Sequence, residues 1–111
     1  MKEFAEVMKA LSDETRLRIL TLLRVRELCV CDLCEALMIS QAKVSRHLAV
    51  LRSAGLVMDE RFAQWMHYRM AEGWWLPFVR QLTGDILATS GQGKTDEKNL
   101  VDWLERKGES C

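Results

Sequence analysis

The spacing of apolar residues changes at Gly55, and this change limits the folds open to the chain. Before Gly55, apolar residues recur every three or four positions, which is typical of amphipathic helices. After it, Leu56–Arg61 and Trp65–Met70 read as two short strands around a turn, which predicts a β-hairpin. Helical spacing returns over 74–90. The order of four helices, a hairpin and a further helix therefore predicts a mainly α fold.

Capping residues indicate where the N-terminal helices begin and end. Residues 3–11 form a short amphipathic helix, and Ser12 and Asp13 are favourable N-cap residues for the next one. Ser40 is placed to cap a fourth helix that ends at Gly55, a common residue just past a helix end. The third and fourth helices are joined by only two residues, and the hairpin follows. This order predicts a winged helix-turn-helix whose fourth helix reads DNA.

The predicted reading helix has one apolar face and one face of small and basic residues. Val44, Leu48 and Leu51 follow helical spacing and are expected to face the core. Between Ser40 and Val57 the chain has bases and no acid, which suits contact with phosphate, although charge alone also fits an ordinary solvated helix face. Arg pairs well with guanine and Gln with adenine in the major groove, and bases on the wing hold phosphate. The residues expected to contact double-stranded DNA are Gln41, Lys43, Ser45, Arg46, His47, Arg61 and Arg69.

Length and composition indicate one small globular domain. The chain has 111 residues, 16 bases and 16 acids, and its thin core would gain from association. No segment has the roughly 20 apolar residues of a membrane span, and the first residues lack the apolar region of a signal peptide. We therefore expect a cytoplasmic protein with reduced thiols and no membrane partner. The sequence offers no catalytic triad, phosphate loop or paired carboxylates, so we expect a non-enzyme.

The apolar stripe of the segment 74–90 and the first helix are expected to join two copies into a homodimer. The predicted interface consists of Phe4, Leu11, Trp75, Phe78, Val79, Leu82 and Ile86. Residues 1–90 are therefore assigned to a DNA-binding and dimerisation domain. Residues 91–111 are assigned to a linker at 91–93, a short C-terminal helix capped by Asp96, and a tail.

Three of the four cysteines fall within six positions, at Cys29, Cys31 and Cys34, where the predicted third helix opens. On a helix, Cys31 and Cys34 are neighbours on one face, whereas Cys29 lies about 200° from Cys31. Binding by all three thiols therefore requires the first turn to be absent or unwound. Soft thiolates select soft acceptors, and three of them suit trivalent arsenic better than tetrahedral zinc. The helix N-terminus is expected to lower the thiol pKa.

Other roles for the thiols remain open from the residues alone. Cysteine fills cores as a small apolar residue. The spacing of Cys31 and Cys34 also fits a thiol redox protein, although such proteins place the motif in a β-α context. A repressor that senses thiol oxidation, or one that senses Cd(II) or Pb(II) with Cys111 as a fourth thiolate, is a further alternative.

Four segments in this order resemble the ArsR/SmtB family of metal-responsive repressors over residues 5–72: LSDETRLRIL, ELCVCDLCEAL, SQAKVSRHLAVLRSAGLV and QWMHYRM. The thiol run is most similar to arsenite-responsive ArsR repressors of the enterobacterial type. The resemblance implies a homodimer, with no constitutive cofactor, that binds a two-fold operator. It also implies that As(III) or Sb(III) bound by Cys29, Cys31 and Cys34 releases the DNA.

Two departures from the family pattern concern the last long helix and the wing. Some members bind zinc on that helix through Asp and His, but residues 74–90 contain Asp85 and no histidine. Members often have Gly at the wing turn, where this chain has Ala63. Ala63 is disfavoured there if the turn needs a positive φ.

Overall fold

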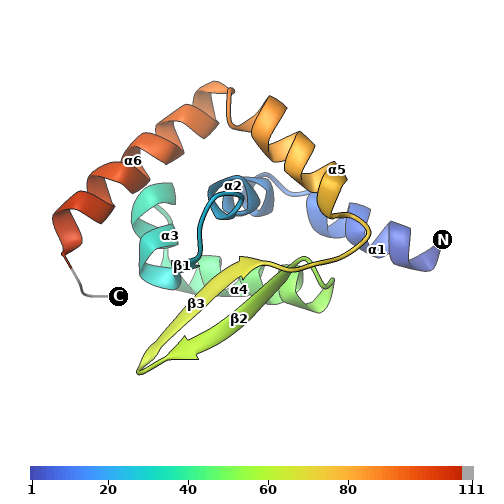
Figure 1. The fold of residues 1–111 in the computed structure, drawn as a ribbon, viewed down its shortest axis with the longest axis horizontal. Helices are drawn as coiled ribbons and strands as arrows, with labels where there is room; N and C mark the ends of the chain where they lie inside the picture. Colours follow the sequence, from blue (N-terminus) through green and yellow to red (C-terminus); the bar gives the residue numbers. More distant parts are fainter. Residues whose placement is uncertain (109–111) are drawn as a thin grey trace.

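The computed structural model describes residues 1–108 and consists of a group of helices with one three-stranded sheet at its edge (Figure 1). The first four helices are α1 (Lys2–Leu11), α2 (Glu14–Leu23), α3 (Val30–Leu37) and α4 (Gln41–Ser53). The strands are β1 (Leu28–Cys29), β2 (Val57–Phe62) and β3 (Trp65–Met70). The chain ends with α5 (Leu76–Gln81), the π-helical segment η1 (Leu82–Leu87) and α6 (Gly91–Lys107). This order confirms the predicted mainly α fold with a hairpin wing.

Side-chain caps begin the second and fourth helices where the sequence predicts them. The Asp13 carboxylate accepts a hydrogen bond from the Arg16 backbone N–H at 3.0 Å. The Ser40 hydroxyl accepts one from the Lys43 N–H at 3.2 Å. Past the end of α4, Gly55 has a φ of 81°, which glycine adopts without a steric cost. Met38 ends α3 with a φ of 58°, and its N–H bonds to the Cys34 carbonyl oxygen.

The core lies between α2, α3 and α4, and α5 and α6 form an arch over it (Figure 1). Val44, Leu48 and Leu51 of α4 are each at most 1% exposed, as the apolar spacing predicts. They pack in one apolar cluster with the fully buried Ile19 and Leu33. Because this face of α4 is buried, the opposite face of the helix is exposed to solvent.

The sheet is antiparallel in the order β1-β3-β2, and its hairpin projects from the body as the wing (Figure 1). The strands β2 and β3 pair from Val57 opposite Met70 to Phe62 opposite Trp65. The turn at Ala63 has a φ of 55°, so this residue does adopt the conformation that glycine would favour. Cys29 pairs with His67, because the first part of the thiol run is a strand and not the start of a helix.

The C-terminal segment differs from the prediction of a linker and a short helix. The first turn of α6 contains Gly91 and Gly93, and the Ser90 hydroxyl caps it by accepting from the Gly93 N–H at 3.0 Å. Asp96 is not a cap but a buried carboxylate, which Arg18 of α2 binds with two hydrogen bonds of 2.9 Å. Leu100 is 4% exposed and belongs to the core. Tertiary contacts therefore hold a 17-residue helix where local glycine content predicted a linker.

Candidate functional site

The outward face of α4 consists of polar and basic side chains. The predicted DNA contacts Gln41, Lys43, Ser45 and Arg46 are all exposed. At the other end of α4, Arg52 Nη1 lies 2.8 Å from Asp59 Oδ2 of β2. This ion pair joins the end of the reading helix to the first half of β2 in the wing.

His47 differs from the other predicted DNA contacts because it faces α2. Its side chain is 15% exposed, and its Nδ1 lies 3.2 Å from Arg16 Nη1 and 3.8 Å from Asp13 Oδ1. Partial burial raises the pKa of Asp13, but the Arg16 N–H and the nearby His47 and Arg16 charges together lower the pKa below its ordinary value. His47 therefore positions α4 against the start of α2, and the structure does not place it among the outward residues.

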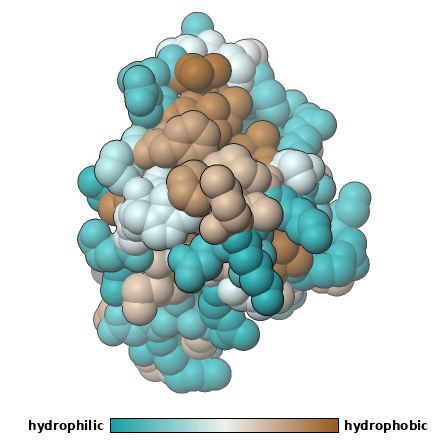
Figure 2. All heavy atoms as spheres, turned by 90° about the vertical axis from the view of Figure 1, so that its right-hand side faces the viewer, coloured by the Kyte–Doolittle hydropathy of each residue, from teal (hydrophilic) through white to brown (hydrophobic). Residues whose placement is uncertain are grey.

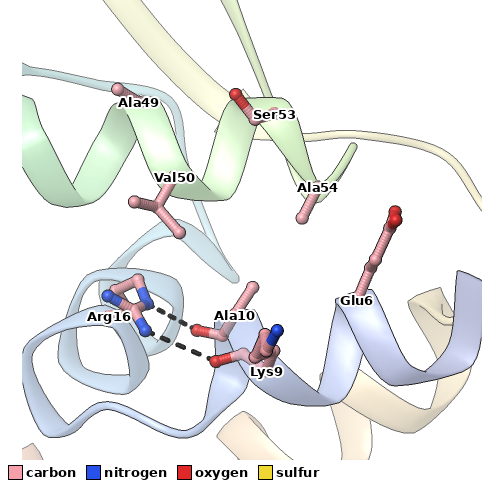
Figure 3. A pocket seen from close by; sticks show the side chains of 8 residues that line it. All are labelled: Glu6, Lys9, Ala10, Arg16, Ala49, Val50, Ser53 and Ala54. Carbon is pink, nitrogen blue, oxygen red and sulfur yellow. Dashed lines mark hydrogen bonds between the residues drawn. The ribbon is translucent and has the colours of Figure 1, made fainter.

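Arg16 also contacts α1, at a pocket of about 490 Å³ behind the reading helix (Figure 3). Its Nε donates to the Ala10 carbonyl oxygen at 2.7 Å, and its Nη2 donates to that of Lys9 at 3.4 Å. These carbonyls lie in the last turn of α1, where helical N–H donors run out, and that of Lys9 also accepts from the Ser12 N–H at 3.2 Å. One guanidinium thus connects the end of α1, the cap of α2 and His47 of α4.

The two predicted wing bases lie on opposite faces of the hairpin. Arg69 pairs with Met58, and Arg61 pairs with Met66. Side chains of paired residues share a face, and faces alternate along a strand, so Met58 and Arg61 point to opposite sides. Arg61 is exposed and Arg69 is half-buried. Arg61 is therefore the wing base that solvent and DNA can reach most easily.

The first cysteine of the run belongs to the cap of α3. Cys29 is 1% exposed and has the extended backbone of an N-cap, with φ −90° and ψ 170°. Its N–H donates to Asp32 Oδ2 at 3.0 Å, and its side chain accepts from the Asp32 N–H, which forms a reciprocal capping box. Cys29 thus lies outside the helix, as binding by three thiols requires.

The other two thiols lie on one side of α3 and line a pocket of about 400 Å³. Cys31 is exposed, Cys34 is half-buried, and both are free. Gln41 of the reading helix, Trp65 of the wing and Trp103 of α6 also line this pocket. Among residues 1–108, no three His, Cys, Asp or Glu side chains are arranged to hold a metal ion. The sulfur atoms of Cys29, Cys31 and Cys34 are therefore not gathered into one metal site in this conformation. The fourth cysteine, Cys111, lies outside the described residues.

The expected lowering of the thiol pKa is wrong for Cys34. Burial raises the pKa of Cys34, and the neighbouring Cys31 and Glu35 raise it further. Cys34 is the fifth residue of α3, beyond the first turn in which the helix dipole acts. Loss of solvent therefore outweighs the helix N-terminus at this position.

Asp32 is a further residue of the site, and the sequence pattern alone does not assign it this role. It is 3% exposed, and its Oδ1 accepts from Trp103 Nε1 at 2.8 Å and from Lys107 Nζ at 2.7 Å. The same carboxylate holds the Cys29 N–H, so it joins the thiol run to α6. A polar residue three positions after Cys29 is a capping pattern that was readable in the sequence, but its partners on α6 were not.

The predicted dimer residues divide into two groups. Leu11, Trp75 and Val79 are at most 7% exposed in one chain, and Leu82 is half-buried, so the core of a single copy already covers much of this set. Phe4, Phe78 and Ile86 are between 49% and 59% exposed. Trp74, which is 48% exposed, stacks on Phe4 with ring centroids 4.3 Å apart. The apolar residues of 74–90 thus lie on two sides of the segment: one side packs into the core of the same chain, and the other is exposed.

Figure 2 shows apolar side chains gathered on the face that carries α1 and α5. The outward members of the predicted set lie in these elements and in the adjoining η1. Within the part of the chain that the structure describes, no helix has the length and apolar character that crossing a membrane requires.

The fold and the exposed basic helix define a winged helix-turn-helix protein. Residues 13–59 match the family model of the bacterial regulatory protein, arsR family. The "Arsenical resistance operon repressor" of Staphylococcus xylosus is 38% identical over 92 residues, which cover 83% of this chain and 86% of that protein. The chain therefore belongs to the ArsR family of bacterial regulatory proteins.

Two further similarities are informative about the site and the assembly. The "Arsenical resistance operon repressor" of Escherichia coli (strain K12) is 55% identical over 67 residues, which are 60% of this chain and 57% of that protein. The chain thus spans a little over half the length of that relative. A homodimeric winged helix-turn-helix DNA-binding domain from Mycobacterium bovis superposes with a TM-score of 0.66 at 25% identity. That comparison covers 99% of this chain and 88% of the other.

Proposed function

We propose that the chain is a cytoplasmic transcriptional repressor that binds two-fold operator DNA as a homodimer. It releases the DNA when As(III) or Sb(III) is bound by Cys29, Cys31 and Cys34. The observation that carries the proposal is the position of these thiols at the start of α3, which leads directly into the reading helix. The printed names of the relatives from Escherichia coli and Staphylococcus xylosus support arsenic as the inducer.

The exposed face of α4 is proposed to enter the major groove. Arg46 and Gln41 have the donors and acceptors that read guanine and adenine edges. Lys43 on the helix and Arg61 on the wing hold phosphate and position the helix without specifying sequence. The Arg16–His47 contact keeps α4 in place from behind.

Two copies are proposed to join through the exposed apolar residues of α1, α5 and η1. Phe4, Trp74, Phe78 and Ile86 would lose solvent in such an interface, and each is about half exposed in one chain. The homodimeric structural relative supports this assembly. A two-fold dimer presents two reading helices to successive turns of one groove, about 34 Å apart.

Release is proposed to begin at the cap of α3. To join Cys31 and Cys34 around one arsenic atom, Cys29 gives up the capping hydrogen bond that its side chain accepts from Asp32. Loss of such a cap costs about 1 kcal/mol and loosens the first turn of the helix. A ligand shifts DNA binding only if it binds one conformation of the protein more tightly than another. We propose that arsenic binds the conformation with the rearranged first turn of α3 more tightly.

The test is fluorescence anisotropy of labelled DNA from upstream of the protein's own gene, at fixed salt because salt controls affinity. We expect the reduced protein to bind and arsenite to release it. The variant Cys31→Ser should bind DNA and ignore arsenite. Release by cadmium or by an oxidant, without release by arsenite, would instead support one of the other inducers.

Charge-matched variants test the reading surface in the same assay. Arg46→Ala and Lys43→Ala should weaken DNA binding, and each should reduce the salt dependence by about one phosphate contact. Lys98→Ala, which removes an exposed base from α6, is the control and should change neither quantity. Equal effects from Lys98→Ala and Lys43→Ala would contradict the assignment of α4 as the reading helix.

A further inference from the structure

One guanidinium group links the end of α1 to the middle of the reading helix. A pocket of about 490 Å³ lies between the two helices, with Glu6 and Ala10 of α1 on one side and Val50 of α4 on the other (Figure 3). Arg16 of α2 also lines this pocket, and it bonds to the Ala10 carbonyl oxygen at 2.7 Å and to His47 at 3.2 Å. The two helices are therefore linked through a side chain that belongs to neither of them.

The hydrogen bond between Arg16 and His47 has only one possible direction. A guanidinium has donors and no acceptor, so the His47 Nδ1 atom accepts from Arg16 Nη1. The ring in this contact is neutral and carries its hydrogen on Nε2. Asp13 is a second charged group at the same nitrogen, with its Oδ1 atom 3.8 Å from Nδ1. Arg16 therefore determines both the tautomer and the orientation of the His47 ring.

The other end of this link depends on whether the last turn of α1 is formed. The helix has 10 residues, and no side chain caps its start. Helices shorter than about 12 residues are marginally stable in water unless packing holds them. The Arg16 side chain is 16% exposed, so water competes little for its bonds to the carbonyl oxygens of Ala10 and Lys9. Fraying of α1 removes these carbonyl oxygens and leaves the guanidinium without its anchor.

The start of α1 carries part of the surface proposed to join two copies. Phe4 is 53% exposed and stacks on Trp74, whereas Val7 and Leu11 of the same helix are buried in the core. A second copy packed on Phe4 holds α1 from its outer side while the core holds it from the inner side. Formation of the dimer thus stabilises the turn to which Arg16 is bonded.

We propose that Arg16 transmits dimer formation from α1 to the reading helix, as the positioning residue of His47. The inference rests on the proposed function and extends it, because the dimer surface then controls the affinity of each reading helix as well as their spacing. In the dimer, α1 is formed, Arg16 is anchored, and α4 is held at His47. When α1 frays, the guanidinium turns away and α4 loses this contact.

The experiment measures operator affinity by anisotropy at protein concentrations at which every variant is dimeric, as analytical ultracentrifugation verifies. Phe4→Ala and Ile86→Ala each remove one apolar side chain that is more than half exposed, but only Phe4 lies on α1. We expect about a threefold loss of affinity for Phe4→Ala, which is typical of coupling between linked residues, and no loss for the matched control Ile86→Ala. Equal losses for the two variants would overturn the inference.

Substitution of Arg16 tests the link itself. Arg16→Met should weaken operator binding about tenfold, in the usual range of coupling between sites. It should leave the salt dependence unchanged, because Arg16 is a positioning residue and not a phosphate contact. Arg16→Lys should lose as much, since a single ammonium group does not reproduce the fork that binds α1 and His47 together. Full affinity in Arg16→Lys, or a weaker salt dependence in Arg16→Met, would overturn the inference.

The double variant shows whether Phe4 acts through Arg16. Phe4→Ala should add no further loss in the Arg16→Met background, because the link through which it acts is already absent. Independent effects that simply multiply would overturn the inference. Circular dichroism verifies that Arg16→Met is folded, and if it is not, the comparison of Phe4→Ala with Ile86→Ala decides the question.

Nitrogen-15 NMR of the His47 ring follows the same link without DNA. At about pH 8, where an ordinary histidine is neutral, the unsubstituted chain should carry the hydrogen on Nε2. In Arg16→Met the nearby Asp13 carboxylate becomes the partner of Nδ1, so a substantial share of the ring should carry the hydrogen on Nδ1. An unchanged Nε2–H ring in Arg16→Met would overturn the inference. A ring that responds in this way, in a chain that does not bind its upstream DNA, would overturn the proposed function and leave the link from α1 to His47 standing.

Discussion

Replacing Asp32 tests whether the thiol run and α6 form one stable unit. The Asp32 carboxylate accepts from the Cys29 N–H, from Trp103 Nε1 and from Lys107 Nζ, at 3.0, 2.8 and 2.7 Å. Asp32→Ala removes a helix cap worth about 1 kcal/mol and leaves a buried N–H without its partner. It also removes two bonds to α6, one of them to a charged group, each worth about 1–2 kcal/mol. We expect unfolding to become easier by about 3–4 kcal/mol.

Urea unfolding followed by circular dichroism measures this loss. A domain of this size has a free energy of unfolding of about 5–15 kcal/mol, so the expected change is large. Asp32→Asn keeps an acceptor for the Cys29 N–H and should lose about half as much. Glu105→Ala removes an exposed carboxylate from α6 and is the control.

A double-mutant cycle with Trp103→Phe isolates the contact between α3 and α6. We expect a coupling free energy of about 1 kcal/mol between the two substitutions. A change of less than about 0.5 kcal/mol for Asp32→Ala, which is the usual range for surface substitutions, would refute the account of this carboxylate.

Three further measurements test particular positions. Ala63→Gly should stabilise the chain by about 0.5–1 kcal/mol in urea unfolding. The steric cost of a left-handed backbone for alanine is larger than the conformational entropy that glycine loses on folding. A destabilised variant would contradict this. The raised pKa of Cys34 predicts that iodoacetamide modifies Cys34 only at higher pH than it modifies a free cysteine in a short peptide, as peptide mass mapping would reveal, and equal pH profiles would count against it. The pKa of Asp13 is lowered in the fold, so its contribution to stability is present above its ordinary pKa of 3.8 and is lost as pH falls through the lower folded value. The stability advantage over Asp13→Asn should therefore shrink between about pH 5 and pH 2, and an advantage independent of pH would disprove the link.

Local signals allowed the helices and the hairpin to be predicted from the sequence. Asp13 and Ser40 cap helices through bonds to residues three positions away, and such patterns are visible in any short window. The buried spacing on α4 follows from helix geometry in the same way. The unfavourable conformation of Ala63 was also predictable, because a glycine is common at the wing turn and alanine adopts a positive φ only at a steric cost.

Tertiary contacts determine the features that the sequence did not reveal. The strand β1 exists because Leu28 and Cys29 pair with β3, almost forty residues later in the chain. The helix α6 continues through Gly91 and Gly93 because Arg18 and Asp32 hold it from other elements. The inward turn of His47 depends in the same way on Arg16, since an edge position on a helix can face either side.

The left-handed residue between α3 and α4 determines how stiff the connection is. Met38 has a φ of 58°, and its N–H bonds to the carbonyl oxygen of Cys34. Glycine there would let the backbone swivel through many angles, whereas methionine has one narrow left-handed basin. The connection between α3 and α4 is therefore stiff. We expect a small tilt of the last turn of α3, which carries Cys34, to rotate the reading helix, because the backbone at Met38 has few other conformations that could absorb the tilt.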